Sequence, residues 1–183
     1  MRLFGIALFV HILGVIAIFA GFSMQQRAGA RLRGSTRYEE ARPWAEVLMM
    51  TRSMVPAGAA MVLVTGLYLT TKFGRRPPVW VPAAMLAALF IGIVALTIVN
   101  RGFARIAKAV SAGSGPLSGD GSAHIASAGT WSALASANGA ALGTLWLMTM
   151  KPGVTETLVA VLLPIVIGAI AGKQVGRRAR APG

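Results

Sequence analysis

The chain has 183 residues, of which 55% are hydrophobic and only 13% are charged. A soluble domain of this size carries about 25% charged residues, so the composition excludes an ordinary water-soluble domain. The 18 lysines and arginines outnumber the 5 acidic residues, which gives a net charge of +13. Because the basic residues flank apolar runs, they indicate membrane topology and contacts with anionic lipid headgroups, not nucleic acid. The absence of cysteine excludes disulfides, thiolate metal sites and iron–sulfur clusters.

The first predicted helix covers residues 3–24 and carries no charge at neutral pH unless His11 is protonated. About 20 apolar residues cross the ~30 Å hydrocarbon core of a bilayer, and the run is too long for a typical cleaved signal peptide. One face of this helix consists of small residues that recur every three to four positions, including Gly14 and Gly21. Another helix can approach such a face closely, so we expect His11, on the same face, to point into a bundle.

The second predicted span covers residues 45–71 and follows a basic connection. We expect its first turns to emerge from the membrane, with a bend near Pro56 and with Arg52 extending its side chain to the interface. Gly58 and Gly66 indicate a packing face on this span.

The third predicted span covers residues 79–99, and residues 102–110 can continue it as a basic amphipathic helix. The Gly-, Ser- and Ala-rich segment 111–129 is predicted to be a flexible loop. The fourth and fifth spans follow at 130–150 and 155–171, and residues 173–183 form a basic tail. Both last spans contain a GxxxG pattern, which predicts tight helix contacts. The glycines of these two patterns are Gly139, Gly143, Gly168 and Gly172.

Together these segments predict a single-domain, all-α polytopic membrane bundle with five transmembrane helices. The connections after the first and third spans and the C-terminal tail hold 12 lysines and arginines, against 5 on the opposite side. The positive-inside rule therefore predicts an N-terminus outside the cell and a cytoplasmic C-terminal tail.

His11 is the first candidate for chemistry, because an ionisable residue deep in a span is a functional hypothesis by default. A neutral imidazole can ligate haem or copper, or relay protons. The alternative is a packing histidine that forms one hydrogen bond with a neighbouring helix. A bis-histidine haem needs a second histidine in the membrane, and the other histidine, His124, lies in the predicted loop. We therefore favour the packing role and keep haem or copper as the alternative.

Methionine thioethers are a second candidate ligand type, because they suit Cu(I), although methionine also fills gaps in apolar packing. The methionines considered are Met50, Met54, Met61, Met148 and Met150. Glu156 is expected to complement the dipole of the fifth helix, and Asn100 and Asn138 to form interhelical hydrogen bonds. The sequence contains no Walker lysine motif, HExxH, GxSxG or pair of intramembrane carboxylates, which favours a protein without a catalytic site.

The run Phe9-Val10-His11-Ile12-Leu13-Gly14, together with Val64-Thr65-Gly66-Leu67 in the second span, resembles a family of bacterial predicted integral membrane proteins of unknown function. Their first helix carries Leu-His-(Val/Ile)-Leu-Gly, and the resemblance covers residues 4–110. More distantly, the first helix is similar to that of copper resistance protein D-like proteins and of the membrane protoporphyrinogen oxidase family. The resemblance implies a small helical bundle with an inward-facing His11 and no transferable catalytic role.

From these observations we expect an integral protein of the bacterial inner membrane that serves as an accessory or structural subunit of a larger membrane complex. Its expected partners are the lipid bilayer, anionic lipids at the cytoplasmic face and that complex. We expect no cofactor in this role. The alternative function is that of a haem- or copper-dependent membrane redox protein that uses His11.

Overall fold

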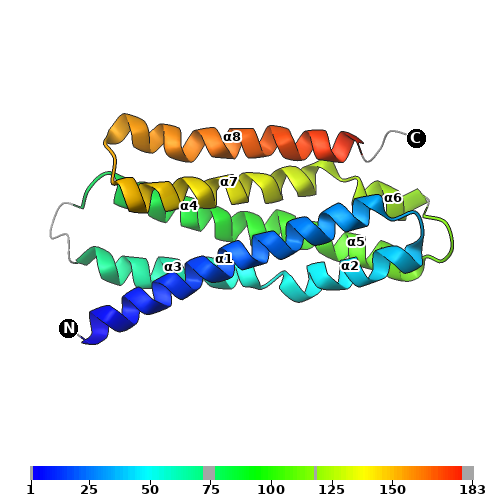
Figure 1. Ribbon diagram of the computed structural model, residues 1–183, viewed down its shortest axis with the longest axis horizontal. Coiled ribbons are helices and arrows are strands. Elements are labelled where there is room, and N and C mark those ends of the chain that lie inside the picture. Colours follow the sequence, from blue (N-terminus) through cyan, green and yellow to red (C-terminus); the bar gives the residue numbers. More distant parts are fainter. Residues whose placement is uncertain (1, 72–76, 118, 179–183) are drawn as a thin grey trace.

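The computed structural model describes residues 2–71, 77–117 and 119–178, which form a bundle of helices aligned along one long axis (Figure 1). In chain order these helices are α1 Arg2–Gly34, α2 Tyr38–Thr51, α3 Met54–Thr70, α4 Trp80–Val94, the π-helical turn η2 Ala95–Val99, α5 Asn100–Ala112, α6 Gly119–Ile125, α7 Ala128–Met150 and α8 Val154–Arg178. The prediction of an all-α helical bundle is confirmed.

Within the described residues, four helical units are long and apolar enough to cross a membrane: α1, α2 with α3, α4 through α5, and α8. The chain is therefore a membrane protein. Each of the first three units spans 33 residues, or about 50 Å, whereas the hydrocarbon core needs only about 30 Å. These units must project beyond the bilayer.

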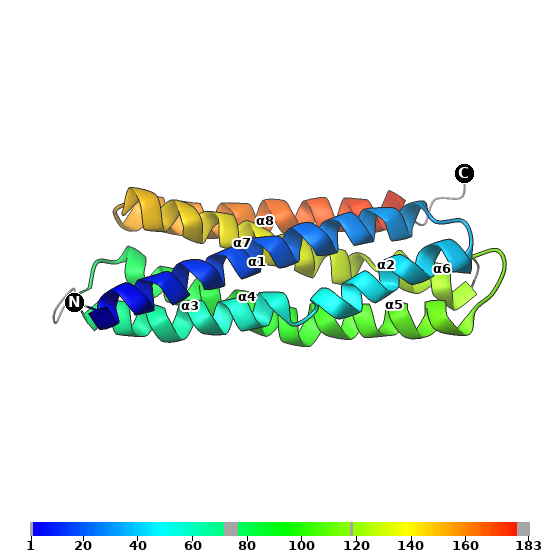
Figure 2. The same ribbon diagram turned by 60° about the horizontal axis from the view of Figure 1, so that its bottom comes forward.

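Helix α7 is less apolar than the four units and packs against both α4 and α8, as Figures 1 and 2 show from two sides.

The second predicted span begins earlier than expected and is interrupted. Helical structure starts at Tyr38, stops after Thr51 and resumes at Met54. Pro56 has no N–H, and its ring clashes with the carbonyl group four residues earlier, which belongs to Arg52. The backbone therefore breaks one turn before the proline. In the third unit, by contrast, α4 continues through η2 into α5, so the expected helical continuation over residues 102–110 is confirmed.

The segment 111–129 is more ordered in its backbone than its composition predicts. The prediction of a loop is wrong for Gly119–Ile125, which form α6. Before this helix, the connection is fixed to the start of α2, where the N–H of Tyr38 donates to the carbonyl oxygen of Gly115 at 3.0 Å. A Cβ on Gly113 would overlap the ring of Tyr38. Glycine at that position thus permits close packing.

At the C-terminal end, α8 continues from the predicted fifth span through residues 173–178 of the predicted tail. Residues 179–183 of that tail lie outside the described residues.

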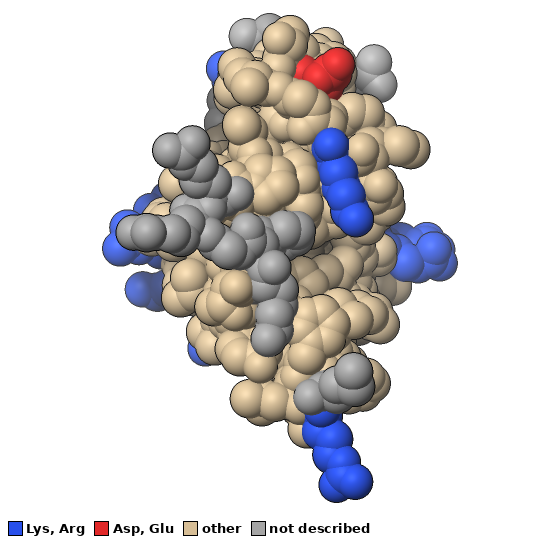
Figure 3. Space-filling model, turned by 90° about the vertical axis from the view of Figure 1, so that its left-hand side faces the viewer, with Lys and Arg blue, Asp and Glu red and all other residues tan. Residues whose placement is uncertain are grey.

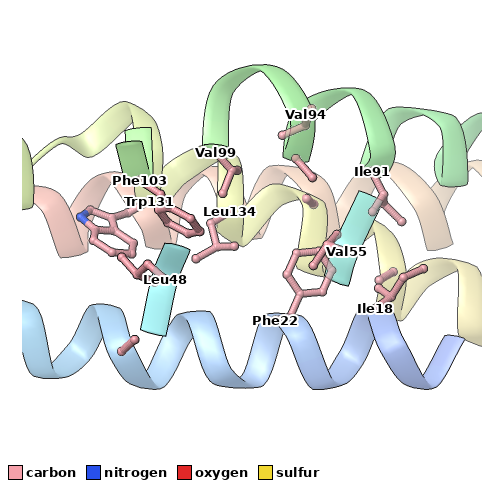
Figure 4. Packing of buried hydrophobic residues seen from close by; sticks show 14 of the residues in the cluster. Ile18, Phe22, Leu48, Val55, Ile91, Val94, Val99, Phe103, Trp131 and Leu134 are labelled. Atoms are coloured by element: carbon pink, nitrogen blue, oxygen red, sulfur yellow. The ribbon is translucent and has the colours of Figure 1, made fainter. Parts of the chain in front are cut away.

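One buried apolar cluster runs along the bundle and joins its two halves (Figure 4). At one end of the view Ile18 of α1 packs near Val55 of α3 and Ile91 of α4. At the other end Phe103 of α5 lies against Trp131 of α7, with their ring centroids 6.3 Å apart. The continuity of this cluster makes the bundle a single packed body.

The contact between α7 and α8 depends on glycine. The GxxxG glycines of each helix lie directly against the backbone of the other, and a Cβ on any of them would overlap it. The contacts pair Gly139 with Pro164, Gly143 with Ala160, Gly168 with Ala135 and Gly172 with Ser132. Beyond this face α8 is exposed, with apolar side chains such as Ile167 directed away from the bundle, as expected for a helix that faces lipid.

We predict that Gly139→Ala lowers the free energy of unfolding by about 1–3 kcal/mol, because the added methyl group overlaps the α8 backbone. The matched control is Gly5→Ala in α1, where a Cβ meets nothing within 4 Å. This control should be neutral or slightly stabilising, since alanine favours a helix over glycine. Thermal unfolding of the detergent-solubilised variants by circular dichroism measures both effects, and equal stability of the two variants would contradict the contact.

Candidate functional site

His11 lies on the face of α1 that packs against α3. Its Nδ1 is 3.1 Å from the hydroxyl oxygen of Thr65, and the Thr65 hydroxyl donates to the carbonyl oxygen of Met61 at 2.6 Å. A threonine hydroxyl has one proton, so its oxygen must accept the bond from His11. These partners assign the proton of the neutral imidazole to Nδ1. Nε2 then carries the lone pair and acts as a hydrogen-bond acceptor or a ligand.

Close approach of α1 and α3 brings His11 to Thr65. A Cβ on Gly14 would lie 2.9 Å from the carbonyl oxygen of Gly58, and a Cβ on Gly58 would lie 2.6 Å from that of Gly14. Near the histidine, a Cβ on Gly66 would lie 3.4 Å from its Cε1. The structure places all the glycines predicted to pack on the first two spans in this contact. They are Gly14, Gly21, Gly58 and Gly66.

A partly open cavity of about 530 Å³ lies beside His11, between α1, α3, α4 and α7. Its volume is within the range of about 300–1,000 Å³ typical of small-molecule sites. The lining is almost wholly apolar, and His11 is its one titratable side chain among the described residues. Met85, Met148 and Trp80 also line the cavity, and no motif or spacing in the sequence links Met85 or Trp80 to His11.

The other candidate ligands are not brought together. His124 belongs to α6, at the opposite end of the bundle from the start of α1 (Figure 1), so the two histidines of one chain cannot share a haem. Of the five methionines considered, only Met148 lines the cavity with His11, and Met50 is 78% exposed on α2. Within the described residues, no group of three or more His, Cys, Asp or Glu residues could hold a metal ion. Glu156 lies in the first turn of α8 and is exposed.

A layer of polar contacts surrounds the break between α2 and α3. Because Pro56 lacks an N–H, the carbonyl group of Arg52 has no helical donor. We assign the Asn100 amide so that its nitrogen faces the carbonyl oxygens, because only the nitrogen can donate; it then donates to the Arg52 oxygen at 3.1 Å and to that of Ala95 at 3.3 Å. From α1, the buried Gln25 donates to the carbonyl oxygen of Thr51 at 3.0 Å. The Asn100 bond joins two helical units, as the sequence predicted.

This polar layer coincides with the ends of the apolar segments. The apolar run of α1 ends just before Gln25, that of α3 begins just after Arg52, and that of α4 and η2 ends just before Asn100. Residues 25–51, 100–117 and 119–132 lie beyond the layer, and we call them the projecting module. The ten residues of α1 in the module extend about 15 Å.

The projecting module is strongly basic at its surface. Its exposed basic residues are Arg27, Arg31, Arg37, Arg42, Arg101, Arg105 and Lys108, and Arg33 is half-buried with its guanidinium 4.6 Å from the centre of the Trp131 ring. Among the described residues the ion pair of this surface joins Arg37 to Glu39 at 3.4 Å. At the opposite end of the bundle, shown in Figure 3, charged side chains are sparse among the described residues.

Two carboxylates tie the helix ends of the module together. Glu39 accepts the N–H of Gly115 at 2.9 Å, and Glu40 accepts the N–H of Thr36 at 3.0 Å. These backbone hydrogen bonds are the main reason that the pKa of each carboxyl group lies below its usual value. Both glutamates are thus ionised near neutral pH and neutralise part of the basic surface.

The fold and the site define an all-α integral membrane bundle with an intramembrane cavity and a basic projecting module. Comparison of the chain with family models, curated proteins and solved structures finds no significant match. The resemblance to the bacterial membrane family therefore stays a prediction, carried by His11 and the glycines around it.

We predict that Asn100→Ala lowers the free energy of unfolding by about 1–3 kcal/mol, because it leaves the Arg52 carbonyl group without a donor. Pro56→Ala restores an N–H at position 56, so in that background Asn100→Ala should cost less. The measurement is a double-mutant cycle of unfolding free energies in detergent. Asn138→Ala is the control, since this half-buried side chain forms no hydrogen bond with the described residues. Equal costs of Asn100→Ala in both backgrounds would argue against the role assigned to Asn100.

Proposed function

We propose that the protein is an accessory subunit of a larger complex in a bacterial inner membrane, and that it presents its projecting module at the cytoplasmic face. The observation that carries the proposal is the module itself. Three helical units continue past the polar layer and pack there around their own buried residues. A protein that required only anchoring would need helices of about 20 residues.

The module is built to hold a fixed surface. Phe103, Ile106 and Val110 of α5 are buried, and α5 packs against α2 and α6. The same helix exposes Arg101, Arg105 and Lys108, whose spacing of three to four residues places them on one face. A basic face on a packed helix complements an acidic surface of a partner subunit, and it also favours contact with anionic lipid headgroups.

The proposed topology has five spans, an outer N-terminus and a cytoplasmic C-terminal end. The start of α1 and the end of α8 lie at opposite ends of the bundle (Figure 1), which supports an odd number of crossings. Helix α7 supplies the crossing that the four long apolar units lack, the fourth in chain order, because it leads from the end that carries α6 back to the start of α8. The basic module lies at the end where α8 finishes, and the positive-inside rule favours the cytoplasm for that end.

This topology predicts the outcome of reporter fusions in a bacterial host. Fusions at Gly115 and at Gly183 should report a cytoplasmic location, and a fusion at Arg76 should report the outer side. Alkaline phosphatase and green fluorescent protein provide complementary readouts, since the first is active outside and the second fluoresces inside. A cytoplasmic signal at both Arg76 and Gly115 would contradict the third crossing, and an outer signal at Gly183 would contradict the fifth.

The accessory role predicts that the chain migrates as part of an assembly larger than its own 19.0 kDa when its native membranes are solubilised in a mild detergent. Combined Arg105→Glu and Lys108→Glu substitutions should release it from the assembly, because they reverse the charge of the α5 face. The control is Arg2→Glu, at the opposite end, which should leave the assembly intact. Blue native electrophoresis measures all three, and a wild-type chain that migrates only as a monomer would overturn the proposal.

The cavity favours one alternative function, that of a haem- or copper-dependent redox protein. His11, Met85 and Met148 line the same space, and imidazole and thioether groups are ligands of both haem iron and copper. The purified protein discriminates between the two functions. A visible absorption band or bound copper that His11→Ala removes would support the redox function, whereas a colourless, copper-free protein would exclude it.

A further inference from the structure

We propose that the cavity beside His11 binds a neutral single-chain lipid alcohol, whose hydroxyl group donates a hydrogen bond to Nε2 of His11. The proposal concerns a site that the accessory role does not use, and it rests on the pairing of His11 with Thr65 inside an apolar cavity.

The hydrogen bonds around His11 determine which kind of head group the cavity accepts. The Thr65 hydroxyl is committed to the Met61 carbonyl group, which assigns the imidazole proton to Nδ1. Nε2 is then an acceptor, so a complementary ligand must bring a proton donor. A hydroxyl group meets this requirement, whereas an ether or a ketone does not.

The depth of the site determines that the ligand is neutral. His11 lies eight residues after Leu3, or about 12 Å along the helix from the start of the apolar run. A charged head group at that depth would have to be paired, and among the described residues the cavity lining contains no charged side chain when His11 is neutral. A neutral hydroxyl avoids this cost.

The shape of the lining determines that the rest of the ligand is an apolar chain. The walls that α4 and α7 contribute include Val81, Ala88, Ile91 and Leu145. The hydroxyl groups in the described lining donate within their own helices, since Thr70 donates to Leu67 and Thr144 donates to Ala140, so towards a ligand they act only as acceptors. A second polar group on the ligand that needs a donor, such as a carbonyl group, would find no hydroxyl proton in this lining and would lose hydrogen bonds to water that these groups do not replace.

The test compares farnesol with farnesyl methyl ether, which differ in the proton donor and keep the same chain. Isothermal titration of the detergent-solubilised, full-length protein should show saturable binding of farnesol, with the ether bound about fivefold more weakly, the change expected for one net hydrogen bond. The preference should disappear in His11→Phe, which keeps an aromatic ring at this position without the acceptor.

A second variant tests the assignment of the proton. Thr65→Val keeps the shape of the side chain but removes the hydroxyl partner of Nδ1 and leaves the backbone contact with Val62, so the preference for the Nδ1-protonated tautomer is weaker and Nε2 presents a donor in part of the molecules. The preference for the alcohol over the ether should shrink in this variant while binding of both ligands persists. Persistent binding would show that the variant is folded, so the smaller preference would report the loss of the His11–Thr65 hydrogen bond and not a general effect on folding.

Three outcomes would overturn the proposal. Equal binding of the alcohol and the ether to the wild-type protein would show that His11 does not accept a bond from the ligand. Failure of both to bind saturably would show that the cavity is not a site for such chains. A haem or copper ion found in the cavity of the purified protein would replace the lipid as its occupant.

Discussion

The structure depends on how the carbonyl groups at the break between α2 and α3, one turn before Pro56, are satisfied. A proline near the start of a membrane segment removes one backbone donor, and an unsatisfied backbone carbonyl group is costly where water is scarce. The bundle solves this with side chains from two other helical units, Gln25 from α1 and Asn100 at the start of α5. Each bond can form only when its helix lies at one position along the bundle axis relative to the break. Together the two bonds therefore fix how the three long units are aligned along that axis.

The consequences of this register extend in both directions along the bundle. Towards the start of α1, it places Gly14 against Gly58 and thereby His11 against Thr65, whose hydroxyl oxygen accepts the Nδ1 proton of the imidazole. Towards α6, it places Phe103 against Trp131 inside the projecting module. The cavity and the module are thus positioned by the same contacts, although they lie in different environments. Because one apolar cluster connects them, the module is rigidly attached to the membrane part.

Much of this arrangement could be predicted from the sequence, because bilayer thickness and apolar run length are directly related. The all-α class, the inward direction of His11 and the continuation of α4 into α5 follow from residue periodicity. Thr65, the partner of His11, could also have been found. The antiparallel pairing of Gly14 with Gly58 places the residues that follow Gly58, Thr65 among them, beside His11. The order within 111–129 could not be predicted. A glycine-rich segment that packs closely against Tyr38 has the same amino-acid composition as a glycine-rich flexible loop, so composition does not distinguish the two. The cavity could not be predicted either, since it depends on side chains from four helices.

The geometry around His11 bears on whether this residue is only a packing element. A histidine that served packing alone would be satisfied by bonds to both ring nitrogens or replaced by an apolar ring of similar size. Here the bond to Thr65 satisfies Nδ1, and the ring lies over Gly66, where the missing side chain leaves room for it. The cavity that His11 lines is large enough for a ligand, and its described lining contains no other titratable group. A ring nitrogen with a lone pair in such a space gains stability when a donor occupies it, and this gain is a physical reason to expect a ligand at this position.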